Sequence, residues 1–226
     1  VEDHRMRFPN LLQAMLADRC LVMTVAGPGW DTRRELSELE RFPYPADLVV
    51  LGYVGNDVSG AAAELGRLPS VPEYGGLDGT SRAIVSRSYA LDFIYWLLPA
   101  RDGGWYARAL RSLYEDPAVF GAHAEDLRKL VERIRERRAR LVVVLFPFLE
   151  DVGASEFFVE PVERFFRGQA VPVLSVAELV AGRRSDELIV NRSDTHPSEL
   201  VHRLIADALH ELLAKDDPCI DPPSPH

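Results

Sequence analysis

The chain has 226 residues, of which 47% are hydrophobic and 27% charged, a composition typical of one globular domain with a sizeable core. Its net charge of -9 argues against a nucleic-acid-binding protein, which needs a basic face, and no apolar run approaches the ~20 residues of a membrane-spanning helix. The only two cysteines, Cys20 and Cys219, cannot build a disulfide framework and are expected as free thiols.

The first elements alternate between helix and strand. Apolar residues at helical spacing predict an amphipathic helix over residues 8–18. A short apolar run, Cys20–Val25, predicts a buried strand that ends at the Gly27-Pro28-Gly29 turn. Thr32 and Glu35 then form a capping box, which predicts that the next helix begins at this point.

A second buried strand is predicted over Asp47–Val54, and it ends in Gly55-Asn56-Asp57. Residues 58–117 are less regular and are expected to form an excursion within the same domain, with apolar helices near Ala90–Leu98 and Trp105–Tyr114. The aromatic residues of these two helices are compatible with an apolar lid over a lipid-like ester or with ordinary core packing.

The second half of the chain predicts further helices and strands in alternation. They are a charged helix over Ala122–Arg138, a strand over Leu141–Phe146, a helix over Phe157–Phe166, a strand over Val171–Leu174 and a helix over Val176–Val180. Pro197 suits the first turn of a last helix, whose apolar stripe continues to Leu213. The tail 216–226 carries four prolines and is expected to be disordered, which leaves a single domain over residues 1–215.

Strands that alternate with helices predict an α/β fold with a parallel sheet covered on both faces. In such sheets the active site lies beyond the carboxyl ends of the strands. Three suggestive segments fall at such positions or on a late loop: residues 27–32, 55–57 and 194–197.

The late segment Asp194-Thr195-His196-Pro197 places a carboxylate beside an imidazole. A general-base histidine needs a partner that holds its tautomer and stabilises the imidazolium, and Asp194 can supply it. The alternative is a capping arrangement at a helix start. A metal site that uses Asp57, Asp194, His196 and Glu199 is a further alternative, disfavoured because only one histidine is well placed.

The two glycine-containing turns suggest donors for an oxyanion. The side-chain amide of Asn56, at the end of a buried strand, can point into a cleft, and the backbone N–H of Gly29 lies near a helix N-terminus. In each case the alternative is an ordinary turn residue. The spacing of Gly27 and Gly29 does not match a dinucleotide-binding fingerprint.

Taken together and in this order, these segments resemble blocks of the SGNH (GDSL-type) serine hydrolase family. Gly29, in Gly-Pro-Gly-Trp-Asp-Thr, is similar to the second block, Gly55-Asn56-Asp57 to the third, and Asp194-Thr195-His196-Pro197 to the last. The resemblance covers about residues 7–57 and 120–214. It implies a three-layer, flavodoxin-like parallel sheet with helices on both faces.

The resemblance further implies an ester hydrolase, of the esterase, lipase or carbohydrate O-acetylesterase type, that needs no cofactor. His196 and Asp194 would be catalytic, Gly29 and Asn56 would form the oxyanion hole, and the substrate would be a small-molecule or glycan ester. An acyltransferase on the same scaffold and a catalytically dead flavodoxin-like binding module are the alternatives.

Two features depart from the family pattern. The Gly-Asp-Ser block, which would supply the nucleophile at the end of the first, central strand, is absent from the sequence, and none of Ser59, Ser81 and Ser88 takes its place. In addition, Asp194 precedes His196 by two residues, whereas the family usually spaces them by three. The chain alone is therefore expected to be poorly stable and inactive.

Overall fold

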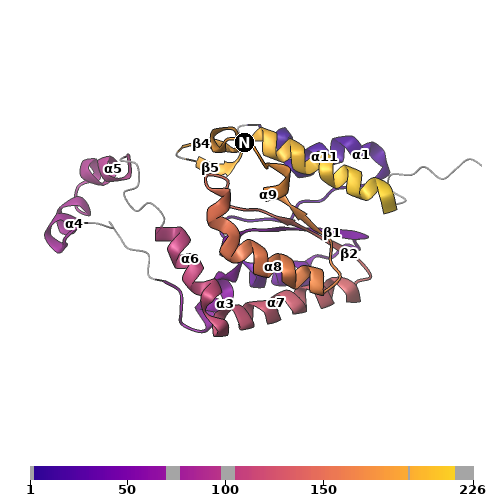
Figure 1. Cartoon of the computed structure of the whole chain (residues 1–226), viewed down its shortest axis with the longest axis horizontal. Coiled ribbons are helices and arrows are strands. Elements are labelled where there is room, and N and C mark those ends of the chain that lie inside the picture. The colour runs from indigo at the N-terminus through magenta and orange to yellow at the C-terminus, as the bar shows by residue number, and fades with distance from the viewer. Residues whose placement is uncertain (1–2, 70–76, 98–104, 193, 217–226) are drawn as a thin grey trace, which may run out of the picture.

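A computed structural model describes residues 3–69, 77–97, 105–192 and 194–216 (Figure 1). Its α-helices are α1 (Phe8–Leu16), α2 (Thr32–Arg41), α3 (Ser59–Glu64), α4 (Gly79–Val85), α5 (Tyr89–Leu97), α6 (Trp105–Glu115), α7 (Pro117–Glu136), α8 (Glu156–Gly168), α9 (Val176–Leu179), α10 (Ser185–Leu188) and α11 (Glu199–Asp216). The 3-10 helices are η1 (His4–Met6), η2 (Ala17–Arg19), η3 (Gly55–Val58) and η4 (Val152–Ser155). None of the helices in this described part is long and apolar enough to cross a membrane.

The central sheet consists of three parallel strands, β1 (Leu48–Tyr53), β2 (Arg140–Leu145) and β3 (Val173–Ser175), in the order β1-β2-β3. All three were expected from their apolar runs, within one or two residues at each end. The chain runs parallel through successive strands because a helix returns it to the starting end of the sheet each time. The protein therefore has the predicted mixed α/β character.

Alternate side chains of β2 enter two separate hydrophobic cores. Val143 and Leu145 are fully buried against helices α3, α6, α7 and α8, whereas Val142 and Val144 pack with α1, α9, α10 and α11. Figure 1 shows α7 and α8 below the sheet and α1 and α11 above it. This alternation is the period-two geometry of a strand that is buried on both faces.

The predicted strand Cys20–Val25 is not a strand in the structure. Its backbone is held instead by the side chain of Gln13, which donates from Nε2 to the carbonyl of Cys20 at 2.9 Å and accepts from the N–H of Val22 at 2.6 Å. Among the described residues β1 pairs only with β2, and no strand pairs with residues 20–25. Cys20 is disulfide-bonded, so the expectation of free thiols is wrong; Cys219 lies outside the described residues.

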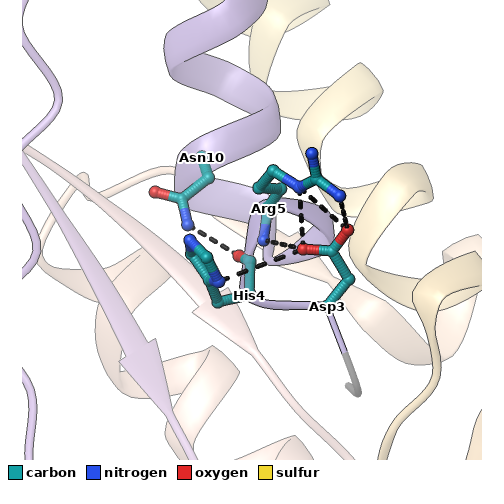
Figure 2. A network of polar contacts seen from close by, with 4 residues as sticks. All are labelled: Asp3, His4, Arg5 and Asn10. Atoms are coloured by element: carbon teal, nitrogen blue, oxygen red, sulfur yellow. Dashed lines mark hydrogen bonds and ion pairs between the residues drawn. The ribbon is translucent and has the colours of Figure 1, made fainter.

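A polar turn leads the chain into α1 (Figure 2). The Asp3 carboxylate accepts from the backbone N–H of Arg5 at 2.9 Å and pairs with its guanidinium, and these bonds lower the pKa of Asp3 to about 2. Asn10 donates from Nδ2 to the carbonyl of His4 at 2.7 Å, which ties α1 to this turn. The start of α1 is thus fixed by local hydrogen bonds.

Helix α11 packs along α1 and ends the fold. The predicted apolar stripe is present, since Val201, Ile205 and Leu209 are fully buried. His202 accepts at Nδ1 from the backbone N–H of Phe8 at 3.3 Å, and its burial lowers its pKa to about 4. A neutral imidazole therefore joins the starts of the two helices.

The segment before α11 is an extended hairpin rather than the predicted loop. β4 (Ile189–Asn191) pairs antiparallel with β5 (Asp194–Pro197). Pro197 ends β5, and α11 begins at Glu199, so the prediction of Pro197 in the first helical turn is wrong. At the open end of this hairpin, the N–H of Ser198 donates to the carbonyl of Leu188 at 2.8 Å.

The excursion over residues 58–117 divides into two parts. Helices α3 and α6 contribute side chains to the core below the sheet, whereas α4 and α5 project away from the body of the molecule (Figure 1). Tyr89 is 96% exposed and Ile94 is 51% exposed, so these residues do not pack as core. Leu98 lies outside the described residues.

Candidate functional site

The Gly29 turn precedes α2 and requires glycine at two positions. Gly29 has a φ of +67°, a left-handed conformation that side chains rarely adopt. A Cβ at Gly27 would overlap the indole ring of Trp30. Asp31, not Thr32, caps the helix, because its side chain accepts from the N–H of Arg34 at 3.0 Å. The backbone around Gly29 is therefore fixed at the N-terminus of a helix, where partial positive charge collects.

Asn56 lies in η3, directly after the carboxyl end of β1. Its Nδ2 donates to the carbonyl of Trp30 at 3.2 Å, so the structure brings the Asn56 side chain to the residue that follows Gly29. A side-chain amide carries two N–H bonds, and one remains for another acceptor. Two of the predicted oxyanion donors thus come from turns that are hydrogen-bonded to each other.

A buried hydrogen-bond chain supports the turn at Asn56. The hydroxyl of Tyr114 donates to the carbonyl of Gly55 at 3.0 Å and lies 2.6 Å from the hydroxyl of Tyr53, which in turn lies 2.7 Å from Nε2 of His123. Burial lowers the pKa of His123 to about 3, so its ring is neutral. Because Tyr114 uses its one proton on Gly55, Tyr53 donates to Tyr114 and His123 donates to Tyr53.

Acidic side chains lie where the two turns meet. Asp57 is 2% exposed and accepts at Oδ2 from the N–H of Val54 at 2.9 Å. Burial and the charge of Asp31 raise the pKa of Glu35 to about 7, and burial followed by the charge of Glu35 raises the pKa of Asp57 well above its usual value. This acidic group was not predictable from the sequence, because Glu35 and Asp57 each have the pattern of ordinary capping or turn residues.

Asp194 and His196 form a hydrogen-bonded pair on β5. Nδ1 of His196 lies 2.6 Å from Oδ1 of Asp194, and the same oxygen accepts from the backbone N–H of His196 at 3.1 Å. The His196 side chain is 85% exposed. Hydrogen bonds from His196 lower the pKa of Asp194, so the carboxylate is ionised and holds Nδ1. This leaves Nε2 directed away from the carboxylate and open to solvent.

The two-residue spacing between these side chains follows from the strand. In an extended chain, residues i and i+2 point to the same face. Asp194 and His196 are two positions apart, with Thr195 between them, so they meet on the same face of β5. The departure noted in the sequence does not prevent the pairing.

The structure does not connect the Asp194–His196 pair to the two turns. Among the described residues, no hydrogen bond or ion pair joins His196 to Gly29 or Asn56. In the view of Figure 1, β5 lies toward the upper left of the sheet, and α3, which follows the Asn56 turn, lies toward the lower left. A cavity of about 340 Å³, lined in part by Leu48 and Arg140, lies at the other ends of β1 and β2.

One serine at a strand end was missed in the sequence. Ser175 is the last residue of β3 and directly precedes α9, but its exposed fraction is only 7%. No hydrogen bond of the described residues joins Ser175 to His196. In the same part of the chain, no group of three or more histidine, cysteine, aspartate or glutamate side chains is arranged to hold a metal ion.

Comparison of the chain with models of known protein families, with curated proteins and with solved structures found no match.

Proposed function

We propose that this chain is the larger part of an SGNH-type serine hydrolase that acts on a small-molecule or glycan ester. The observation that carries the proposal is the pairing of Asp194 with Nδ1 of His196 at 2.6 Å, which leaves Nε2 accessible. An imidazole held in this way has the tautomer of a general base, because its Nε2 lone pair is free to accept a proton. The Asn56–Trp30 hydrogen bond beside Gly29 adds the second part of the machinery.

The chemistry assigned to these groups is acyl transfer through a serine. The serine hydroxyl attacks the ester carbonyl and gives its proton to Nε2 of His196, which then protonates the departing alcohol. Water repeats these steps on the acyl-enzyme and regenerates the serine. The N–H groups of Gly29 and Asn56 hold the oxyanion, and each such donor contributes about 2.7–4 kcal/mol to lowering the barrier.

The serine comes from a strand that completes the sheet. The edge of β1 that faces away from β2 has no strand partner in the described structure, and Leu21, Met23 and Val25 are 80%, 50% and 49% exposed. These alternate residues suit one face of a strand, and a strand between them and β1 would occupy roughly 10 Å at ~4.8 Å per step. We place the Gly-Asp-Ser block at its carboxyl end, which gives the flavodoxin-like, three-layer sheet.

Esterase turnover tests this function. The 226-residue chain is compared with a chain that also carries the residues encoded immediately before Val1, with p-nitrophenyl acetate as the substrate. We expect turnover only by the extended chain, and we expect His196→Ala to abolish it while Ser175→Ala leaves it unchanged. Turnover by residues 1–226 alone that His196→Ala removes would refute the assignment of the serine to an added strand. A folded extended chain that carries Gly-Asp-Ser and shows no turnover would refute the hydrolase.

Acyl transfer to an alcohol uses the same groups as hydrolysis, so product analysis belongs to the same assay. With a sugar acceptor present, a hydrolase releases free acetate and a transferase yields the acetylated sugar.

A further inference from the structure

Three carboxyl groups gather where α2 meets the turn that follows β1. Asp31 caps α2, and Glu35 lies one helical turn further along. A Cβ added at Gly60 would lie 2.9 Å from the Asp31 carboxylate, so α3 begins against the capping residue. Asp57 follows Asn56 and is buried. The segments that carry Gly29 and Asn56 thus meet at an acidic contact as well as at the Asn56–Trp30 hydrogen bond.

Glu35 is the group in this contact whose charge has no compensation. Its Oε2 atom is shielded from solvent and has no hydrogen-bond partner. The same is true of the hydroxyl oxygen of Thr32 in the same helical turn. Arg33, the nearby cation on α2, is engaged by Glu64 of α3 and by Asp126 of α7. Other ionisable groups whose pKa responds to the charge of Asp57, Glu35 or Arg33 are Tyr53 of β1, Tyr106 and Tyr114 of α6, and His123 of α7.

We propose that Glu35 is a positioning residue for the two oxyanion donors: its neutral carboxyl group allows the start of α2 to pack against the Asn56 turn, and its ionisation drives these segments apart. The role in catalysis rests on the function proposed above, whereas the movement is a property of the chain itself. Burial of an ionised carboxylate without a partner costs free energy, and a second acidic group beside it adds repulsion.

The direction of the pH effect follows from the raised pKa. When the contact is closed, the pKa of Glu35 is about 7, and when it opens, this pKa returns toward its usual value of 4.5. The closed contact is therefore fully stable below the lower value and loses stability as the pH rises through the higher one. Between these values the ionisation of Glu35 increases the opening equilibrium by about tenfold per pH unit, and above about pH 7 its contribution levels off. Asp57, whose pKa is also raised, adds to the same trend.

Amide hydrogen exchange in the 226-residue chain tests this inference without any need for esterase activity. The probes are the N–H groups of Val54 and Asp57, which bond within the Asn56 turn. After correction for intrinsic exchange, we expect their opening in the wild type to rise at least about tenfold per unit between pH 5 and pH 7. Glu35→Gln keeps the shape without the charge and should make this rise about tenfold per pH unit less steep, leaving the part that Asp57 contributes, whereas Glu38→Gln, in the next turn of α2, should leave it unchanged.

The same pH response in Glu35→Gln as in the wild type would overturn the inference. If Glu35→Gln does not fold, Asp31→Asn serves as the second test. This variant should fold, because asparagine caps helices as well as aspartate does. Removal of the Asp31 charge lowers the pKa of Glu35, so the rise in opening should end at a lower pH. An unchanged end point in Asp31→Asn would contradict the proposal, and neither result depends on the hydrolase assignment.

Discussion

At the scale of single residues, hydrogen bonds hold the side chains of His196 and Asn56 in fixed orientations. Asp194 fixes one nitrogen of His196, and Asn56 spends one of its amide N–H bonds on the carbonyl of Trp30. In the proposed hydrolase the amide is thereby oriented before substrate binds. Such preorganisation is what makes a donor effective, because no reorganisation is needed when charge develops on the substrate oxygen.

Removal of the Asn56 amide should lower the rate of the chemical step. In the extended, active chain we expect Asn56→Ala to reduce kcat by about 10²–10³-fold with little change in KM, since an oxyanion donor acts mainly in the transition state. Steady-state kinetics on p-nitrophenyl acetate measure both constants. A change confined to KM would show that Asn56 binds the ground state instead.

The buried hydroxyl of Tyr114 should matter for stability. Tyr114→Phe leaves the carbonyl of Gly55 and the hydroxyl of Tyr53 without their partner in the core, which costs about 1–3 kcal/mol. Urea unfolding measures this loss. Tyr106→Phe on the same helix removes a hydroxyl from a residue that is 52% exposed and should change the stability little. Equal losses of stability in Tyr114→Phe and Tyr106→Phe would show that the buried hydrogen-bond chain does not stabilise the fold.

At the scale of elements, the sequence predicted those that carry their own signal. β1 and β2 are continuous apolar runs, and α11 has an apolar stripe, so their identity does not depend on the rest of the fold. Cys20–Val25 has the same kind of signal, but a strand exists only where another strand pairs with it. β5 was missed because Asp194-Thr195-His196-Pro197 is polar and extended only through its pairing with β4.

The residues of the candidate site were predictable from the sequence, but the buried hydrogen bonds that hold them in place were not. Gly29, Asn56, Asp194 and His196 stood out through their positions after strands or beside one another. The chain of Tyr53, Tyr114 and His123 was not predictable, because these residues are separated by up to 70 positions and each reads as ordinary core. Which tyrosine meets which histidine depends on packing between α6, α7 and β1.

The exposed apolar segment should respond in opposite ways in the short and extended chains. Met23→Lys should reduce self-association of the 226-residue chain, because it places a charge on an exposed apolar strip. In the extended chain we expect residues 20–25 to join the sheet beneath the helices that cover its faces, so the same substitution buries a lysine and should lower the free energy of unfolding by a few kcal/mol. Light scattering and urea unfolding measure the two effects, and a neutral result in the extended chain would place the added strand elsewhere.

At the scale of the whole molecule, helices form two cores, one on each face of the sheet, while the outer edges of β1 and β3 have no strand partner among the described residues. The cores explain why most elements have definite places without further residues. If residues 20–25 flank an added strand at the open edge of β1, as we propose, that strand would end between the Gly29 turn and the Asn56 turn. Parallel sheets of this kind place their chemistry at such carboxyl ends.

The most direct measurement is a crystal structure of the extended chain after reaction with a serine-directed organophosphonate. The account predicts a covalent bond to the serine of the added strand and a phosphonyl oxygen about 3 Å from the N–H groups of Gly29 and Asn56, with Nε2 of His196 beside the serine oxygen. A structure in which His196 lies on a different side of the sheet from Gly29 and Asn56 would contradict the account.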